Sequence, residues 1–172
     1  MADDPKQVLR AAQIDAQRGE FSHPWNPLSQ VRGATMARTS GLKRVSVNHV
    51  RIAPGKESYT PHAHQREEEW IYVLAGQGIV LIADEEWEVG PGDFIAVPTP
   101  QSVHHLRNPG PLELVCLMGG ENAAYDAVDF PVQGKRLVRI GNDVRLYEAG
   151  ADDPAGHPDA VFSAAVRGRD VR

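Results

Sequence analysis

The sequence predicts an all-β protein built as an antiparallel sandwich or barrel. Short apolar stretches recur at regular intervals between Leu42 and Met118, and clusters rich in glycine and proline separate them, at residues 76–78, 90–92 and 98–100. Regularly spaced strands with turn residues between them are typical of antiparallel β-structure. Several stretches are apolar on both faces, which indicates that the outer face is also covered in places.

The chain has 172 residues, enough for one domain with a sizeable core. We divide it into an N-terminal arm over residues 1–41, a β-barrel core over residues 42–120, and a C-terminal extension over residues 121–172. The extension is expected to pack on the barrel as a hairpin followed by a tail. No internal repeat is visible, so the core is a single unit.

Charge and apolar content restrict the partners. The chain carries 18 basic and 23 acidic residues, a net charge of −5, and neither sign forms a long block. This pattern predicts no nucleic-acid partner and no membrane surface. No run of about 18 apolar residues occurs, and the acidic N-terminus differs from a secretory signal, so we expect a cytoplasmic protein. The single Cys116 lies in an apolar stretch and is expected to be a buried strand residue.

The N-terminal arm has weak local signals. Asp4 and Pro5 can start a helix, as cap and first helical residue, with a thin apolar stripe that ends near Gly19. Residues 20–42 are interrupted by proline, and we predict no regular structure there. A strand is predicted from Leu42 to Ile52.

The strands of the core follow from alternation and turn signals. They are predicted at residues 70–74, 79–83, 86–89, 93–97, 104–107 and 112–118. The turn at Asp84-Glu85 lacks the Asp-Gly pair of a tight hairpin, so it is longer or slightly strained. After Gly120 the strand rhythm fades, except for a hairpin between Lys135 and Tyr147, and a loosely held tail is expected from Ala149 onward.

The strand after residue 68 is apolar on both faces. If Glu69, Ile71 and Val73 face the barrel interior, the alternate side chains face outward. These outward residues are Trp70, Tyr72 and Leu74. An outward apolar patch is normally covered, so either the N-terminal arm or a second copy of the chain lies on it, and we favour a homodimer.

The most informative stretch is His62-Ala63-His64 followed by Glu69. Side chains alternate along a strand, so the two histidines share a face with Cα atoms roughly 6.6 Å apart, close enough to share one ion. A straight strand would turn Glu69 to the opposite face. A turn within residues 65–68 is therefore predicted, forming a hairpin that brings the carboxylate back over the histidines.

Two motifs resemble those of the cupin superfamily. Gly55, the His62-x-His64 pair, Glu69 and Gly76 are similar to the first cupin motif, with one extra residue before His62. The second motif is similar over residues 92–108, which include Gly92, Pro98, His104 and Asn108. Pro100 replaces the usual glycine there, and one extra residue precedes the histidine. The spacing to Asn108 favours His104 over His105 as the motif histidine.

The resemblance implies a cupin-type double-stranded β-helix, or jelly-roll barrel, as found in small single-domain bacterial cupins of unassigned role, some labelled sugar-phosphate-isomerase-like. It implies one divalent transition metal ion held by His62, His64, Glu69 and His104. Zinc, manganese, iron and nickel all suit this ligand set. Glu67 and Glu68 are alternative ligands, but Glu69 keeps the apolar alternation of its strand. His49 could also enter the pocket, although a surface position is favoured.

Function is less determined, because the cupin barrel hosts many reactions. We favour a metalloenzyme acting on a small oxygen-rich molecule, either an isomerase or epimerase of sugar phosphates or a dioxygenase. An isomerase needs basic residues for the phosphate, from Arg51, Lys56, Arg66 or Arg107. A dioxygenase needs an apolar pocket, which Phe94, Ile71 and Leu106 could line. The alternative is a non-catalytic metal-dependent sensor or binding protein.

Overall fold

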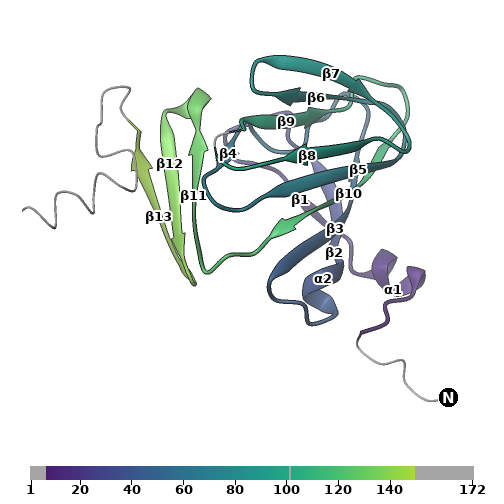
Figure 1. Cartoon of the computed structure of the whole chain (residues 1–172). Coiled ribbons are helices and arrows are strands. Elements are labelled where there is room, and N and C mark those ends of the chain that lie inside the picture. The colour runs from purple at the N-terminus through teal and green to yellow at the C-terminus, as the bar shows by residue number, and fades with distance from the viewer. Residues whose placement is uncertain (1–6, 101, 150–172) are drawn as a thin grey trace, which may run out of the picture.

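The computed structural model describes residues 7–100 and 102–149 (Figure 1). The helices are α1 (Ala11–Ala16), α2 (Met36–Thr39) and the 3₁₀ turn η1 (Pro131–Gln133). The strands are β1 (Gly19–Phe21), β2 (Val31–Thr35), β3 (Val45–Ile52), β4 (Ala63–His64), β5 (Glu69–Ala75), β6 (Gly78–Ile82), β7 (Glu85–Val89), β8 (Phe94–Val97), β9 (His104–Arg107), β10 (Leu114–Glu121), β11 (Tyr125–Phe130), β12 (Lys135–Ile140) and β13 (Asp143–Glu148). The predicted all-β class and the core strands are confirmed, with ends that differ by up to three residues.

Two antiparallel sheets form the barrel. The larger sheet has the order β1-β2-β3-β10-β5-β8, and the smaller has the order β7-β6-β9. Their inward faces meet in one apolar core, which buries strand residues of both sheets. The core contains Val50, Ile52, Val73, Val80, Leu106, Leu114 and Cys116, all at most 2% exposed. Burial of these side chains is the main force that closes the barrel, at about 25 cal/mol per Å² of apolar surface.

Strand β5 alternates as its sequence predicts. Ile71 and Val73 are buried, whereas Tyr72 and Leu74 are exposed on the outer face. Cys116 of the neighbouring β10 is fully buried, as predicted, and burial raises the pKa of its thiol to about 12. This cysteine is therefore a core residue with no thiolate character near neutral pH.

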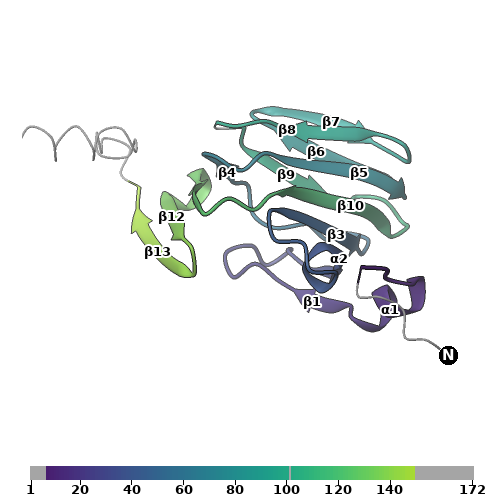
Figure 2. The same ribbon diagram turned by 60° about the horizontal axis from the view of Figure 1, so that its bottom comes forward.

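A third sheet lies beside the barrel. Its order is β13-β12-β11-β4, so the C-terminal extension pairs directly with the short strand that carries His64. The predicted hairpin is confirmed, with Gly141-Asn142 as its turn between Ile140 and Asp143. In Figures 1 and 2 this sheet stands at one end of the molecule and α1 at the other. The prediction that strands fade after Gly120 was wrong for β11, and the predicted tail lies almost entirely outside the described residues.

The N-terminal region contains more regular structure than its sequence suggests. Residues 20–42 were predicted to be irregular, but β2 pairs with β3 over residues 31–35, and α2 follows it. The prediction was wrong because the prolines all precede residue 28, before β2 begins. Helix α1 begins at Ala11, later than predicted, and Asp4 and Pro5 lie outside the described residues. In the part of the chain that is described, no helix is long and apolar enough to cross a membrane.

The turn between β6 and β7 holds a strained residue. Ala83 has φ +54°, in the left-handed region, and strands β6 and β7 pair immediately on either side of Ala83-Asp84. This agrees with the predicted strain, since an alanine in this region costs roughly 1–2 kcal/mol.

We expect Ala83→Gly to raise the free energy of unfolding by about 0.5–1 kcal/mol, because the relief of left-handed strain exceeds the added entropy of glycine. Urea denaturation of both proteins measures this difference. The matched control is Asp84→Gly, at a position without positive φ, which should leave stability unchanged or lower it. Equal stabilisation by both changes would contradict the explanation.

Candidate metal centre

Two histidines from different motifs become neighbours through backbone pairing. His62 forms an antiparallel bridge with His104 at the start of β9. The His62 N–H donates to the His104 carbonyl at 3.3 Å, and the His104 N–H donates to the His62 carbonyl at 2.9 Å. Directly opposed residues in an antiparallel pair have neighbouring side chains on one face. The two imidazole centroids are accordingly 4.3 Å apart.

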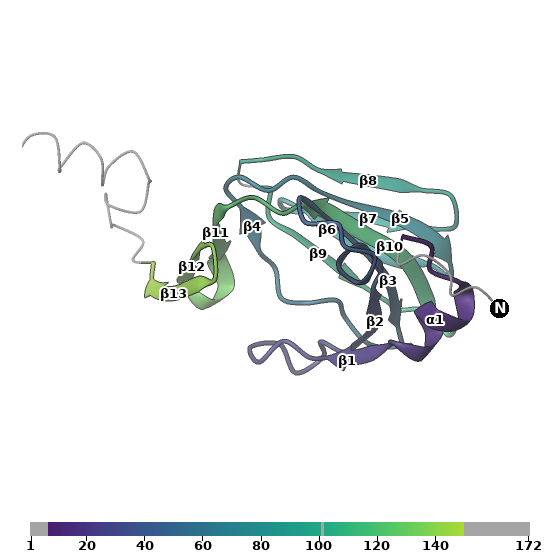
Figure 3. The same cartoon turned by 90° about the horizontal axis from the view of Figure 1, so that it is seen from below.

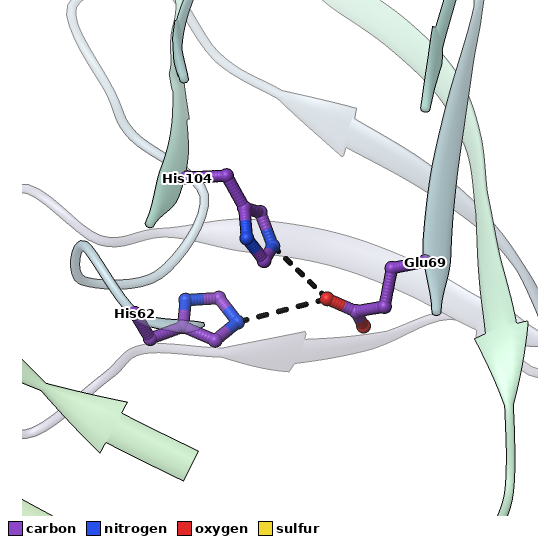
Figure 4. A group of neighbouring side chains, drawn as sticks. All are labelled: His62, Glu69 and His104. Carbon is purple, nitrogen blue, oxygen red and sulfur yellow. Dashed lines mark ion pairs between the residues drawn. The ribbon is translucent and has the colours of Figure 1, made fainter. Parts of the chain in front are cut away.

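The carboxylate of Glu69 lies at the centre of the histidines. Its Oε2 atom is 2.9 Å from His104 Nε2, 3.4 Å from His64 Nε2 and 3.8 Å from His62 Nε2. Figure 4 shows His62 and His104 with their Nε2 atoms turned toward this carboxylate. All four residues singled out from the sequence therefore meet at one point inside the barrel.

The path from His64 to Glu69 differs from the predicted hairpin. The chain bends at Gln65 and Arg66, which confirms the turn, but β4 and β5 do not pair with each other. Strand β4 pairs with β11, whereas β5 lies between β10 and β8 in the larger sheet. The hairpin prediction was wrong because a turn connects two different sheets here. The carboxylate reaches the histidines across the barrel interior.

A glycine opposite Glu69 makes room for it. Gly120 of β10 pairs with Glu69 of β5. A Cβ atom on Gly120 would lie 2.5 Å from the Glu68 carbonyl oxygen and 3.0 Å from Glu69 Cγ. Any larger residue at position 120 would therefore displace the carboxylate.

Each imidazole donates through its Nδ1 atom. His62 Nδ1 lies 2.8 Å from the Thr60 carbonyl oxygen, and His104 Nδ1 lies 3.1 Å from the Ser102 carbonyl oxygen. His64 Nδ1 lies 2.5 Å from Asp126 Oδ2. Carbonyl oxygens and ionised carboxylates only accept hydrogen bonds, so Nδ1 carries the proton in each ring. In a neutral ring the Nε2 atom then has its lone pair directed toward Glu69.

The protonation states of His62 and Glu69 favour metal binding. Burial first, and then the nearby charge of His104, lower the pKa of His62 to about 3, so this ring is neutral near pH 7. Burial alone would raise the pKa of Glu69, but the hydrogen bond from His104 and the neighbouring imidazoles hold it at about 2. The carboxylate is therefore ionised. Neutral imidazole and ionised carboxylate are the forms that bind divalent metals.

The alternative ligands His105 and Glu67 have other partners. His105 points away from the cluster, with its Nε2 atom 3.3 Å from Glu57 Oε2. Glu67 accepts hydrogen bonds from Arg139 at 2.5 Å and from the Ala123 N–H at 2.6 Å. These contacts favour His104 over His105 and Glu69 over Glu67.

Two further sequence alternatives also lie away from the cluster. The backbone of Glu68 pairs with Glu121 at the end of β10. His49, on β3, is half-buried and contacts Arg18 Nη1 at 3.0 Å, so it does not line the cavity beside the cluster.

A small cavity adjoins the cluster. It has a volume of about 70 Å³. Its lining includes His62, Glu69 and His104, the polar residues Ser46, Asn48, Ser58 and Tyr59, and the apolar side chains of Ile71, Val97, Leu106 and Met118. Ile71 and Leu106 were predicted to line the pocket, and they do. Phe94 does not, because it lies on the outer face, 62% exposed and stacked on Trp70.

Sequence reasoning missed Asp126. It is 2% exposed and lies on β11, beyond both motifs. The local sequence, Tyr125–Phe130, shows only an aspartate of the kind that is usually a surface residue. Its role becomes visible only through the pairing of β11 with β4.

The closed antiparallel barrel and the His-x-His, Glu and His cluster inside it define a cupin-type protein. The family model of the cupin domain matches residues 48–118. A candidate sugar phosphate isomerase of Acidithiobacillus ferrooxidans is 33% identical, with a TM-score of 0.79, over 83% of this chain and 92% of that one. The chain therefore belongs to the cupin superfamily.

Other relatives agree with this assignment. A sugar phosphate isomerase from Silicibacter pomeroyi, known from its crystal structure, is 18% identical in sequence and has a TM-score of 0.70. The match covers 83% of this chain and 92% of that one. At this identity it supports the fold alone. An uncharacterised protein of Methanocaldococcus jannaschii is 39% identical over 67 residues. That match spans 38% of this chain and 53% of the archaeal protein.

Proposed function

We propose that the chain is a metal-dependent enzyme acting on a small oxygen-rich molecule, with His62, His64, Glu69 and His104 as metal ligands. The observation that carries the proposal is the convergence of three imidazole Nε2 atoms on one carboxylate oxygen, while every Nδ1 atom is occupied. With each Nδ1 atom bonded elsewhere, the three Nε2 atoms and the carboxylate are the groups that remain to bind a cation placed among them. A divalent ion held there would polarise a carbonyl or hydroxyl oxygen of the substrate as a Lewis acid.

The cavity supplies two polar groups that can orient a substrate. The Asn48 amide and the Tyr59 hydroxyl have no hydrogen-bond partner among residues 7–100 and 102–149. Burial raises the pKa of Tyr59, and the charge of Glu69 adds to this, so the phenol keeps its proton and can donate it in a hydrogen bond. Tyr59 and Asn48 would therefore hold a substrate oxygen beside the metal ligands.

The charges around the cavity favour a hydroxy-carbonyl group over a phosphate. None of the described lining residues is a lysine or an arginine. Three of the predicted phosphate ligands are engaged elsewhere: Arg51 pairs with Glu113, Arg107 pairs with Glu86, and Arg66 lies over the ring of Tyr125. The cavity would thus hold the reacting carbonyl end of a substrate. Isomerisation of a sugar-type molecule is the first candidate, supported by the 33% identical relative.

A dioxygenase is the second candidate. Ile71, Val97, Leu106 and Met118 give the cavity an apolar side close to the three cavity-lining metal ligands. An apolar wall suits O₂ as a cosubstrate better than it suits a second charged group. A dioxygenase consumes O₂ and an isomerase does not, so a measurement of O₂ uptake distinguishes the two reactions.

Metal analysis and turnover assays test the proposal. We expect about one divalent ion per chain when the protein is purified without added metal, and turnover of one class in a panel of sugar phosphates, their unphosphorylated forms, catechols and diketones. Tyr59→Phe should lower kcat/KM by roughly 10–100-fold with unchanged metal content, because one oriented hydrogen-bond donor is lost. Bound metal without turnover would favour the non-catalytic binding protein, and no bound metal would refute the proposal.

The outer face of β5 and β8 supports a homodimer as part of this proposal. Tyr72, Leu74 and Phe94 are exposed there. Gln17 and Arg18, directly after α1, contact Thr39 of α2 and His49 of β3 instead. Exposed apolar groups of this size commonly mark an interface. A molar mass measured in solution at twice the 18.8 kDa of one chain is the expected result.

A further inference from the structure

The C-terminal extension is built into the candidate metal centre. Strand β11 pairs with β4 so that Val128 faces His64 and Asp129 faces Ala63. Figures 1 and 3 show β11 beside β4 at the edge of the barrel. The cupin domain match ends at residue 118, so this strand lies beyond the matched segment. The pairing places Asp126 next to the first metal-binding motif.

Asp126 uses both carboxylate oxygens on that motif. Its Oδ2 atom accepts from His64 Nδ1 at 2.5 Å, and its Oδ1 atom accepts from the Arg66 N–H at 3.0 Å. The side chain is 1% exposed, so water does not compete for these bonds. The bond to Nδ1 keeps the proton on that atom, and His64 Nε2 is then the nitrogen that faces Glu69 at 3.4 Å.

His64, Glu67 and Asp126 could also be considered as a second metal site, since their ligand atoms lie close together. Two donors held at right angles by one ion at about 2.1 Å are about 3 Å apart. The His64 Nδ1 to Asp126 Oδ2 distance of 2.5 Å is too short for this and fits a hydrogen bond. Glu67 is also committed to Arg139 and the Ala123 N–H. The three residues therefore form a hydrogen-bonded support.

The same extension holds the turn between His64 and Glu69. The Gln65 N–H donates to the Ala127 carbonyl oxygen at 2.9 Å, and the Gln65 side-chain amide donates to Asp129 at 2.5 Å. Arg139 of β12 reaches Glu67 at 2.5 Å. The segment connecting two of the proposed ligands is thus bound to β11 and β12 along its length.

We propose that Asp126 is a positioning residue that orients His64 for metal binding, so that the C-terminal extension completes the metal centre. This inference rests on the proposed function for the identity of His64 as a ligand. Partners of this kind fix the tautomer and direction of a metal-binding imidazole, and their loss typically weakens metal affinity 10–100-fold.

The test compares Asp126→Ala and Asp126→Asn with Asp143→Asn as the matched control, because Asp143 is an exposed aspartate of β13 in the same sheet. We expect Asp126→Ala to weaken metal binding 10–100-fold in chelator competition, Asp126→Asn to retain part of the affinity, and Asp143→Asn to change it less than twofold. In the copper(II)-loaded proteins, electron spin echo modulation reports the remote nitrogen of each bound imidazole. The signal of one imidazole, that of His64, should change in the Asp126 variants. No imidazole signal should change in the control variant.

The outcomes separate this inference from the proposed function. If the unchanged protein binds metal and Asp126→Ala matches it in affinity and echo modulation, the inference is wrong and the function stands. If the unchanged protein binds no metal, the function is wrong, and ¹⁵N–¹H correlation of the metal-free protein still tests Asp126. His64 should then have its proton on Nδ1, and Asp126→Asn, which preserves volume, should alter that signal. An unaltered signal would refute the positioning role.

Discussion

Replacement of His104 by alanine is expected to lower metal affinity by roughly 1000-fold, since even an outer hydrogen-bond partner contributes 10–100-fold and a direct ligand contributes more. His104 has the shortest contact to the central carboxylate, 2.9 Å from Glu69 Oε2. It is also the only proposed ligand from the second motif, so its loss opens one side of the cluster. Chelator competition with zinc or cobalt measures the affinity.

The adjacent histidine is the matched control. His105→Ala removes the same side chain one residue later, but His105 faces Glu57 and lies outside the cluster. Metal affinity should change less than threefold in this variant, because no proposed ligand or its hydrogen-bond partner is lost. If His105→Ala loses the metal and His104→Ala keeps it, the assignment of the ligand set is wrong.

The sequence allowed the four clustered residues to be identified because each signal is local. His62 and His64 share a strand face by alternation, and His104 was singled out by the resemblance to the second cupin motif, in which its distance to Asn108 decides between it and His105. The structure brings these residues together as expected. Their role as ligands remains a prediction that the metal measurements test.

Asp126 could not be found in the same way. It is 62 positions from His64, and their contact depends on the register between β11 and a two-residue strand. Asp126 also interrupts the apolar alternation on the buried face of β11, and this alternation is the signal that would have indicated a strand. Strand β2 was missed for a related reason: its sequence contains Gly33, and its conformation is set by pairing with β3 more than by its own residues.

Replacement of Gly76 by alanine should lower the free energy of unfolding by roughly 2–5 kcal/mol, the sum of left-handed strain and overpacking. Gly76 has φ +78° and follows β5 at the turn into β6. A Cβ atom there would lie 2.4 Å from the Glu113 carbonyl oxygen and 2.9 Å from Leu114 Cα. Both are backbone atoms next to a fully buried leucine, so no side-chain rotation relieves the contact. Urea denaturation measures the loss.

Gly55 separates the two contributions. It has φ +72°, nearly the same as Gly76, but nothing lies within 4 Å of a Cβ atom placed on it. Gly55→Ala should therefore cost only the conformational part, roughly 1–2 kcal/mol. The difference between the two variants measures the close approach of β10 to the end of β5. Equal losses would mean that the backbone at Glu113 moves away freely, and that Gly76 is needed for its positive φ alone.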